Sequence, residues 1–265
     1  MSSPSHDKHD ELAGTEQPFV AHLMELRDRL IRAAVSVLLV FGALCIYPTP
    51  SGLYDLLAAP LVSHLPAGQT LIATSVISPF VVPLKVTLLA AFLLALPVVL
   101  YQAWAFIAPG LYAHEKRLVM PLVLSSTLLF FAGVAFCYFF VFGQVFKFIQ
   151  SWAPKSIAAT PDVEAYLGFV MNMFIAFGAA FEVPVVVMVL VRMGLVTLQK
   201  LREFRAYFIV VAFVIAAVIT PPDVVSQLAL AIPMCLLYEV GIWAAGLFSR
   251  YSKAPDEEPE QGAAQ

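Results

Sequence analysis

The chain has 265 residues, of which 61% are hydrophobic and 12% are charged, with a net charge of −3 and a mean hydropathy of +0.87. Soluble domains have about half apolar and about a quarter charged residues, so this composition excludes an ordinary soluble protein. Lys and Arg gather at the ends of apolar runs and not in basic, aromatic-rich patches, so we expect no nucleic-acid partner.

Both ends of the chain are polar. Residues 1–17 contain no apolar core or small-residue cleavage site, so we expect a disordered N-terminus and not a removed signal peptide. Residues 251–265 are acidic and contain Pro, which predicts a disordered tail. Cys45, Cys137 and Cys235 lie inside apolar runs, and we interpret them as small buried hydrophobic residues, not as a disulfide framework.

Between these ends, residues 18–250 are predicted to form an all-α membrane domain of six spans, because a helix needs about 20 apolar residues to cross the bilayer. The predicted spans cover residues 30–47, 81–107, 118–146, 165–191, 207–220 and 224–243. The last two are short, and 207–220 would extend only about 21 Å. Short spans imply a locally thinner bilayer beside them.

The distribution of basic residues predicts the orientation. Of the 15 Lys and Arg residues, all except Lys85, Lys147 and Lys155 fall on one side of the predicted spans. Basic residues are enriched in cytoplasmic segments, so both termini are expected in the cytoplasm of a bacterial-type cell, with the chain in its inner membrane.

Recognisable catalytic motifs are absent from the sequence. There is no P-loop, no H-E-x-x-H, no G-x-S-x-G and no paired Cys motif, and His114-Glu115 lacks the second histidine of a zinc-protease helix. We therefore expect a protein that is not an enzyme and holds neither a cofactor nor a metal ion.

Glu182 is the most unusual residue of the apolar runs. It follows Phe-Gly-Ala-Ala-Phe and precedes Val-Pro-Val, and a carboxylate at membrane depth is unfavourable unless it faces protein or water. One interpretation is a functional group in a polar intramembrane cavity. The other is a protonated or hydrogen-bonded structural residue.

Two further acidic residues lie near the predicted cytoplasmic interface. Glu25 has Arg29 one helical turn later and Asp28 has Arg32, so two ordinary surface ion pairs are the simpler interpretation. Glu115 alone would be a charged loop residue. Together, Glu25 and Glu115 can receive two guanidinium groups, since adjacent arginines of an extended peptide point to opposite sides.

A series of motifs gives the sequence a specific resemblance. The motifs are His22-Leu23-Met24-Glu25-Leu26-Arg27-Asp28-Arg29-Leu30, Ala59-Pro60-Leu61, Ser78-Pro79-Phe80, residues 101–112 (YQAWAFIAPGLY), His114-Glu115-Lys116-Arg117, Phe177-Gly178, Phe181-Glu182-Val183-Pro184, Thr220-Pro221-Pro222-Asp223-Val224 and Ser226-Gln227. The motifs occur in the same order as in the TatC family, whose members are the receptor subunit of the twin-arginine protein translocase. The resemblance covers about residues 18 to 250.

The resemblance implies a concave, glove-like arrangement of the six spans and a function in moving folded proteins, driven by the proton motive force. The family binds twin-arginine signal peptides at its cytoplasmic face. By resemblance, Glu25 and Glu115 are the acidic site for this peptide, with Arg27, Phe106 and Leu111 nearby.

The resemblance also assigns residues away from the signal-peptide site. Glu182 corresponds to the polar residue of the concave face within the membrane. Thr220, Asp223 and Gln227 match the segment where the single-span partners TatB and TatA are thought to dock. Pro60 matches an external cap that supports assembly with other copies of the chain.

Two functional hypotheses remain open on the residues alone. The paired carboxylates favour a translocase receptor, whereas Glu182 and the proline-containing second and sixth spans favour a proton-coupled transporter of small solutes. An intramembrane hydrolase lacks any nucleophile-base motif.

Overall fold

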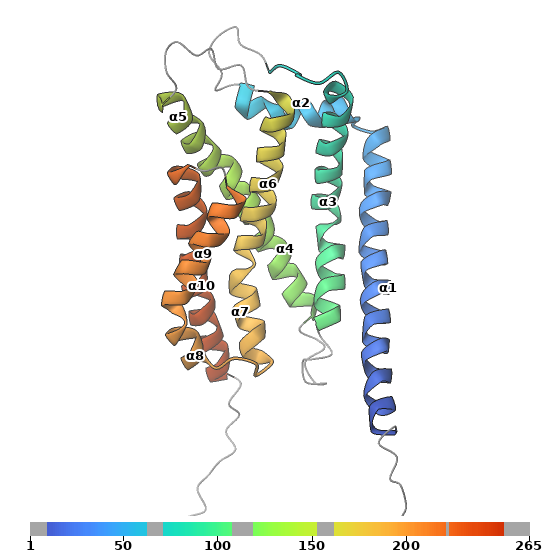
Figure 1. Cartoon of the computed structure of the whole chain (residues 1–265), viewed down its shortest axis with the longest axis vertical. Helices are drawn as coiled ribbons and strands as arrows, with labels where there is room; N and C mark the ends of the chain where they lie inside the picture. Colours follow the sequence, from blue (N-terminus) through green and yellow to red (C-terminus); the bar gives the residue numbers. More distant parts are fainter. Residues whose placement is uncertain (1–9, 63–70, 108–118, 153–161, 221–222, 252–265) are drawn as a thin grey trace, which may run out of the picture. The chain divides into compact units, whose positions relative to one another are not determined.

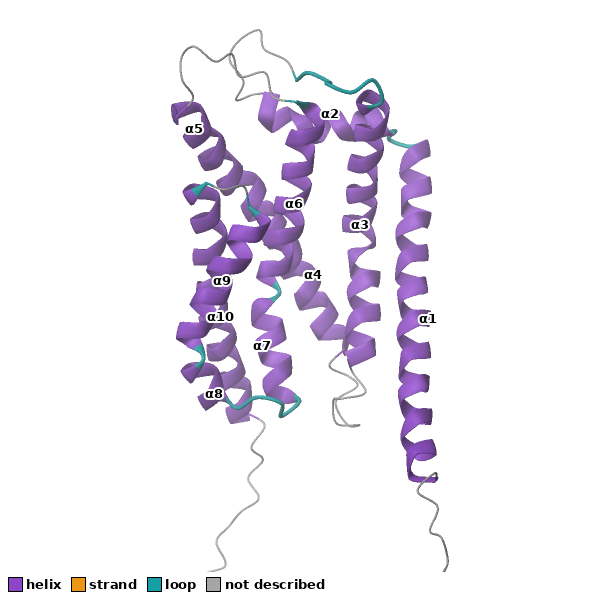
Figure 2. Cartoon of the chain, viewed as in Figure 1, coloured by secondary structure: helices purple, strands orange, loops and turns teal. Residues whose placement is uncertain are grey.

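The computed structural model describes residues 10–62, 71–107, 119–152, 162–220 and 223–251, and these are almost entirely helical (Figures 1 and 2). Within them, β-pairing is limited to an isolated parallel bridge between Ile72 and Asp162. The helices are α1 (Asp10–Ile46), α2 (Pro50–Val62), α3 (Ser78–Ile107), α4 (Val119–Phe136), the π-helical turn η3 (Cys137–Val141), α5 (Phe142–Trp152), α6 (Val163–Phe181), α7 (Val183–Arg192), α8 (Leu198–Glu203), α9 (Arg205–Ile219) and α10 (Val224–Tyr251).

Five helical stretches among the described residues are long and apolar enough to cross a membrane. They are His22–Ile46, Ser78–Ile107, Val119–Phe148, Val163–Arg192 and Val224–Leu247. A sixth apolar helix, α9, has 15 residues, which extend about 22 Å, less than a hydrocarbon core of about 30 Å. The prediction of an all-α membrane protein with six apolar helices and a short fifth span is confirmed.

The helices at the two ends of the chain exceed their predicted limits. The first helix begins at Asp10, within the segment predicted to be disordered. The last continues to Tyr251, so the helix that contains span six is not short. Extending an existing helix fixes one residue per hydrogen bond, whereas nucleation fixes several, so a polar flank readily continues a neighbouring apolar helix.

The chain divides into two compact units, residues 1–127 with 160–167 and residues 128–159 with 168–265. In the first unit, α1 runs alongside α3, and α2 also packs against α3 (Figure 1). Large apolar side chains of α1, including Leu38 and Leu39, remain exposed. A helix face bordered by lipid is expected to be apolar and exposed in this way.

One end of the first unit is tied together by the carboxylate of Glu164, at the start of α6. Lys85 of α3 donates to its Oε1 from Nζ at 2.6 Å. The hydroxyl of Ser78 donates to its Oε2 at 2.9 Å. One acidic side chain therefore holds two positions of α3 against the first turn of α6.

Asp162, directly before α6, makes a second connection. Its Oδ2 accepts from the backbone N–H of Ala165 at 3.0 Å, which caps the helix. Its Oδ1 accepts from the hydroxyl of Thr74 at 2.9 Å and from the Thr74 backbone N–H at 3.2 Å. The Ala165 N–H, followed by the Thr74 hydroxyl, lowers the pKa of Asp162 below its usual value because these donors favour the carboxylate.

In the second unit, α10 packs against α7 and α9 and also contacts α8 and α5. Tyr238 of α10 is central to this packing. Its ring stacks on Phe208 at 3.9 Å between centroids, and its hydroxyl donates to the backbone carbonyl of Leu201 at 2.9 Å. The buried side chains of Val187 and Ile242 complete the cluster, so the four helices α7, α8, α9 and α10 share one core.

In the same unit, the second half of α4 packs closely against α6. A Cβ atom at Gly133 would overlap the backbone carbonyl of Phe177, and one at Gly178 would overlap the ring of Phe130. Small residues permit such contact between membrane helices, whose packing relies on dispersion attraction.

Candidate functional site

Glu25 lies on α1, where helical spacing places Arg29 on the same face. Both Nε and Nη2 of Arg29 donate to the Glu25 Oε1 atom, at 2.9 and 2.6 Å, as the i,i+4 spacing predicted. The Oε2 atom faces His22 Nδ1 at 4.0 Å, beyond hydrogen-bond distance. Among the described residues, no hydrogen bond is donated to Oε2, and the side chain is 36% exposed. This oxygen therefore remains accessible to a further donor.

His22 connects α1 to the end of α3. Its imidazole ring stacks on Phe106 with centroids 4.3 Å apart and planes inclined by 18°. Glu25 and Phe106, which are 81 positions apart in the sequence, therefore lie on neighbouring helices at one end of the first unit. The sequence alone did not predict the contribution of His22, although this residue belongs to the motif around Glu25.

The neighbouring charges differ in part from the predicted pattern. Arg27 donates from Nη2 to Asp28 Oδ1 at 2.9 Å and from Nε at 3.1 Å, so the expected ion pair between Asp28 and Arg32 does not form. Adjacent side chains on this exposed surface can meet by bending toward each other, and such ion pairs contribute little stability. Arg27 is exposed and lies two positions after Glu25, on another face of α1. Leu111 and Glu115 lie outside the described residues.

Glu182 lies at the junction between α6 and α7 and not in a continuous helix. Pro184 follows in the first turn of α7. Its ring nitrogen has no hydrogen to donate, so the helical ladder is interrupted here. The Glu182 N–H bonds to the Ala179 carbonyl at 3.1 Å, and its own carbonyl accepts from Val186 at 3.0 Å. Glu182 thus occupies a local break of the predicted span, with its side chain half-buried.

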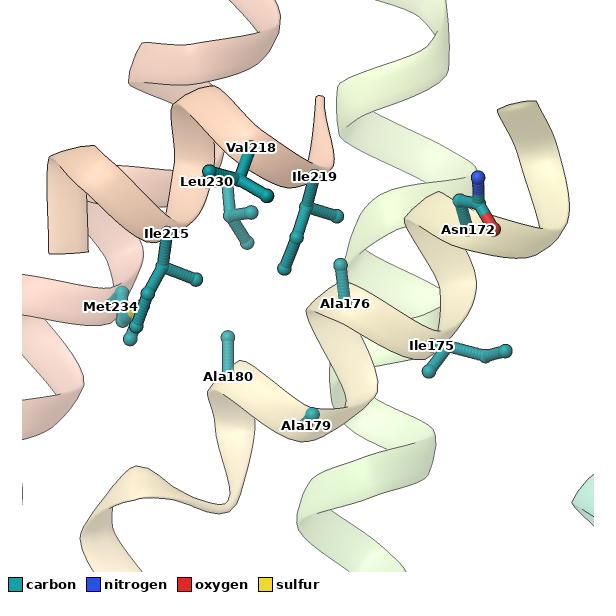
Figure 3. Close-up of a pocket in the computed structure, with 10 residues that line it drawn as sticks. All are labelled: Asn172, Ile175, Ala176, Ala179, Ala180, Ile215, Val218, Ile219, Leu230 and Met234. Carbon is teal, nitrogen blue, oxygen red and sulfur yellow. The ribbon is translucent and has the colours of Figure 1, made fainter. Parts of the chain in front are cut away.

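A cavity of about 530 Å³ lies in the second unit between α6, α9 and α10. Alanines of α6 face branched side chains of α9 across it, and Asn172 lies at one side (Figure 3). Its lining residues are Asn172, Ile175, Ala176, Ala179, Ala180, Ile215, Val218, Ile219, Leu230 and Met234. Asn172 was missed by the sequence interpretation, although an amide inside an apolar run is the same kind of signal as Glu182.

The residues predicted to dock partners bond within the chain where α9 ends and α10 begins. The buried Thr220 hydroxyl donates to the Ala216 carbonyl at 2.8 Å. Asp223 Oδ1 accepts from the backbone N–H of Ser226 at 2.7 Å and so caps α10. Gln227 donates to the Phe213 carbonyl of α9 at 3.3 Å. These bonds stabilise the end of α9 and the start of α10 and join the two helices.

Pro60 lies in α2, near the end of that helix.

The structure offers no metal site in the residues it describes, since no group of three His, Cys, Asp or Glu side chains comes together there. The described residues provide accessible carboxylates and apolar surfaces, which suit the binding of other molecules.

Comparisons with known proteins agree with the motif series. The family described as "Sec-independent protein translocase protein (TatC)" matches residues 21–233. A protein of that name from Azotobacter chroococcum is 50% identical, over 93% of this chain and 96% of the relative. Another, from Escherichia coli K12, is 48% identical over 89% of each chain.

A solved structure supports the same assignment at the level of the fold. It is described as "Crystal Structure of Twin Arginine Translocase Receptor- TatC" and is 42% identical, with a TM-score of 0.75, over 86% of this chain and 100% of the other. Sequence and fold agree over most of the chain, and we conclude that it belongs to the TatC family of Sec-independent protein translocase proteins, multi-pass components of the inner membrane that function in protein transport.

Proposed function

We propose that this chain is the core receptor and scaffold subunit of a twin-arginine translocation system. It binds the Arg-Arg signal peptides of folded precursor proteins and recruits single-span partners for export driven by the proton motive force. The observation that carries the proposal is the stack of His22 on Phe106, because it joins two separate motifs of the expected peptide site. Family membership favours this hypothesis over a small-solute transporter.

Glu25 supplies the first contact for the peptide. Its Oε2 can accept from one signal-peptide arginine while Arg29 stays bound to Oε1. A guanidinium has a planar set of donors that a lysine ammonium lacks, so a pair of carboxylates discriminates Arg-Arg from Lys-Lys. Glu115, beyond the end of α3, is proposed as the acceptor for the second arginine, with Arg27, Phe106 and Leu111 around the peptide.

The acidic site is proposed to lie on the cytoplasmic side, together with both termini. Support comes from Arg192, Lys200, Arg202 and Arg205, which all lie at or between the ends of α7 and α9. The positive-inside rule places such basic connections in the cytoplasm. Lys85, at the start of α3, is then on the outer side.

Partner subunits are proposed to dock beside the α9–α10 turn. A helix of 15 residues leaves the bilayer locally thin, and single-span TatA and TatB helices are the proposed neighbours there. Glu182 is proposed as the polar residue of the intramembrane wall, and Pro60 as part of an external cap that contacts other copies of the chain.

The peptide site is tested by crosslinking the full chain, in membranes, to an Arg-Arg precursor and to its Lys-Lys version. Glu25→Ala and Glu115→Ala should each weaken the Arg-Arg crosslink about tenfold, because each removes a charge-assisted hydrogen bond. The Lys-Lys signal should stay at its own low level in every variant.

Glu203→Ala is the matched control, because it removes the same charge from an exposed residue of α8 that bonds only to Gln199 among the described residues. It should leave the Arg-Arg crosslink unchanged. Equal crosslinking by the Glu25 and Glu115 variants and the wild-type chain would refute the receptor proposal.

A further inference from the structure

A second cavity, of about 290 Å³ and lined by charged side chains, lies in the second unit where α8 leads into α9. Arg202, Arg205, Glu239, Ile242 and Trp243 line it. None of these residues belongs to the proposed peptide site or to the turn between α9 and α10. Its function is therefore open.

The charges of this cavity leave one guanidinium in excess. Arg205 Nη2 donates to Glu239 Oε2 at 2.7 Å, which joins the start of α9 to α10 and holds Arg205 in place. Arg202 has no ion-pair partner within the part of the chain that the structure describes, and its side chain is exposed. The cavity thus presents one oriented and one unpaired guanidinium, a combination that suits a phosphate anion.

The surroundings of the cavity have the features of a membrane interface. Trp243 is 73% exposed, and Phe204 stacks on the exposed Tyr207 at 5.7 Å between centroids. Exposed Trp and Tyr side chains gather at the level of lipid headgroups. Polar α8 also gives way to apolar α9 at this point, which is the change in polarity expected where headgroups meet hydrocarbon.

An apolar strip leads away from the cavity along α10. Leu236, Val240 and Trp243 are all exposed, and their spacing of four and three residues places them on one face of the helix. An acyl chain can lie along this strip while its headgroup reaches the arginines. A free phosphate ion would make no use of it.

We propose that Arg202 and Arg205 bind the phosphate of an anionic phospholipid, with Leu236, Val240 and Trp243 of the apolar strip against its acyl chain. The shared chemistry is a phosphate anion, and the apolar strip identifies lipid as its source. Basic cavities between membrane helices are known to bind anionic headgroups in this way. The bound lipid would hold the polar end of short α9 at the interface.

The test is native mass spectrometry of the purified full chain in detergent, titrated with phosphatidylglycerol or with zwitterionic phosphatidylethanolamine. The wild-type chain should retain phosphatidylglycerol preferentially. Arg202→Gln should reduce that retention about fivefold, since each basic residue near anionic lipid contributes a factor of this size. Trp243→Ala should reduce retention of both lipids.

Lys200→Gln is the matched control, because Lys200 lies on the same short helix, carries the same charge and does not line the cavity. It should bind phosphatidylglycerol like the wild-type chain. An equal loss in Lys200→Gln and Arg202→Gln would show attraction to overall charge and would overturn the site. Release of the lipid by equimolar inorganic phosphate would overturn lipid as the source.

Discussion

At the scale of single residues, buried polar groups depend on partners that come from other helices. The indole of Trp104 on α3 donates from Nε1 to the hydroxyl of Ser126 on α4 at 2.9 Å. Both side chains are buried. In an apolar environment a donor without a partner is unfavourable, so this bond fixes how the two helices meet.

Ser126→Ala is expected to lower the thermal unfolding midpoint of the purified chain in detergent, by the equivalent of about 1 kcal/mol. The variant leaves the Trp104 N–H buried without an acceptor. Ser125→Ala is the control, since among the described residues the Ser125 hydroxyl bonds only to the carbonyl of Leu122 in its own helix. An equal shift in both variants would contradict the role assigned to the Trp104 bond.

Asp162 makes a pH-dependent contribution to stability. Its pKa is lowered in the folded chain from an ordinary 3.8, so its stabilisation is complete above that value and is lost as pH falls through the lowered pKa. The difference in unfolding midpoint between wild type and Asp162→Asn should therefore be largest above about pH 4 and shrink in more acidic buffer. A difference that does not change with pH would contradict this.

At the scale of helices, two kinds of local sequence decide how an apolar run is used. Pro184 interrupts the hydrogen bonds between α6 and α7 and leaves Glu182 at the break. Gly133 has no side chain at the point where α4 meets the Phe177 backbone. One residue breaks a helix, and the other lets two helices touch.

Gly133→Ala is expected to destabilise the second unit by about 1–3 kcal/mol, the usual effect of overpacking. The added methyl group meets backbone, which cannot move aside as a flexible side chain can. Gly168→Ala in α6 is the matched control, because a Cβ there has nothing within 4 Å. The midpoint of thermal unfolding should fall for the first variant only, and a similar fall in both would indicate a general effect of replacing glycine.

At the scale of the whole molecule, the composition and the six apolar helices make this a membrane protein of the TatC family. The connections between spans must then alternate between the two aqueous sides. Residues 71–77 precede α3 on the proposed outer side. Leu195 lies in the connection from α7 to α8, on the proposed cytoplasmic side.

The orientation is testable by labelling single cysteines after Cys45, Cys137 and Cys235 are replaced by Ala. Val76→Cys, at a position 99% exposed, should react with a membrane-impermeant maleimide in intact spheroplasts. Leu195→Cys, at a position 63% exposed, should react only after the membrane is permeabilised. The opposite pattern would reverse the proposed orientation of both termini.

Much of the fold could be predicted from local sequence. Apolar runs predict membrane helices because lipid cannot satisfy backbone N–H and C=O groups, and a helix satisfies them within the segment. The i,i+4 spacing likewise predicted the bond between Glu25 and Arg29. Asp28 was assigned wrongly to Arg32 because, on an exposed surface, several partners are nearly equal in energy.

The sequence by itself determined the helical class, the number of apolar segments and the family, because each depends on composition and on motifs in order. Only the tertiary structure decided that His22 meets Phe106, that Glu164 joins Lys85 and Ser78, and that Arg202 and Arg205 line a cavity with Trp243. These contacts join residues far apart in the chain. Their formation depends on how helices pack side by side, which no local periodicity encodes.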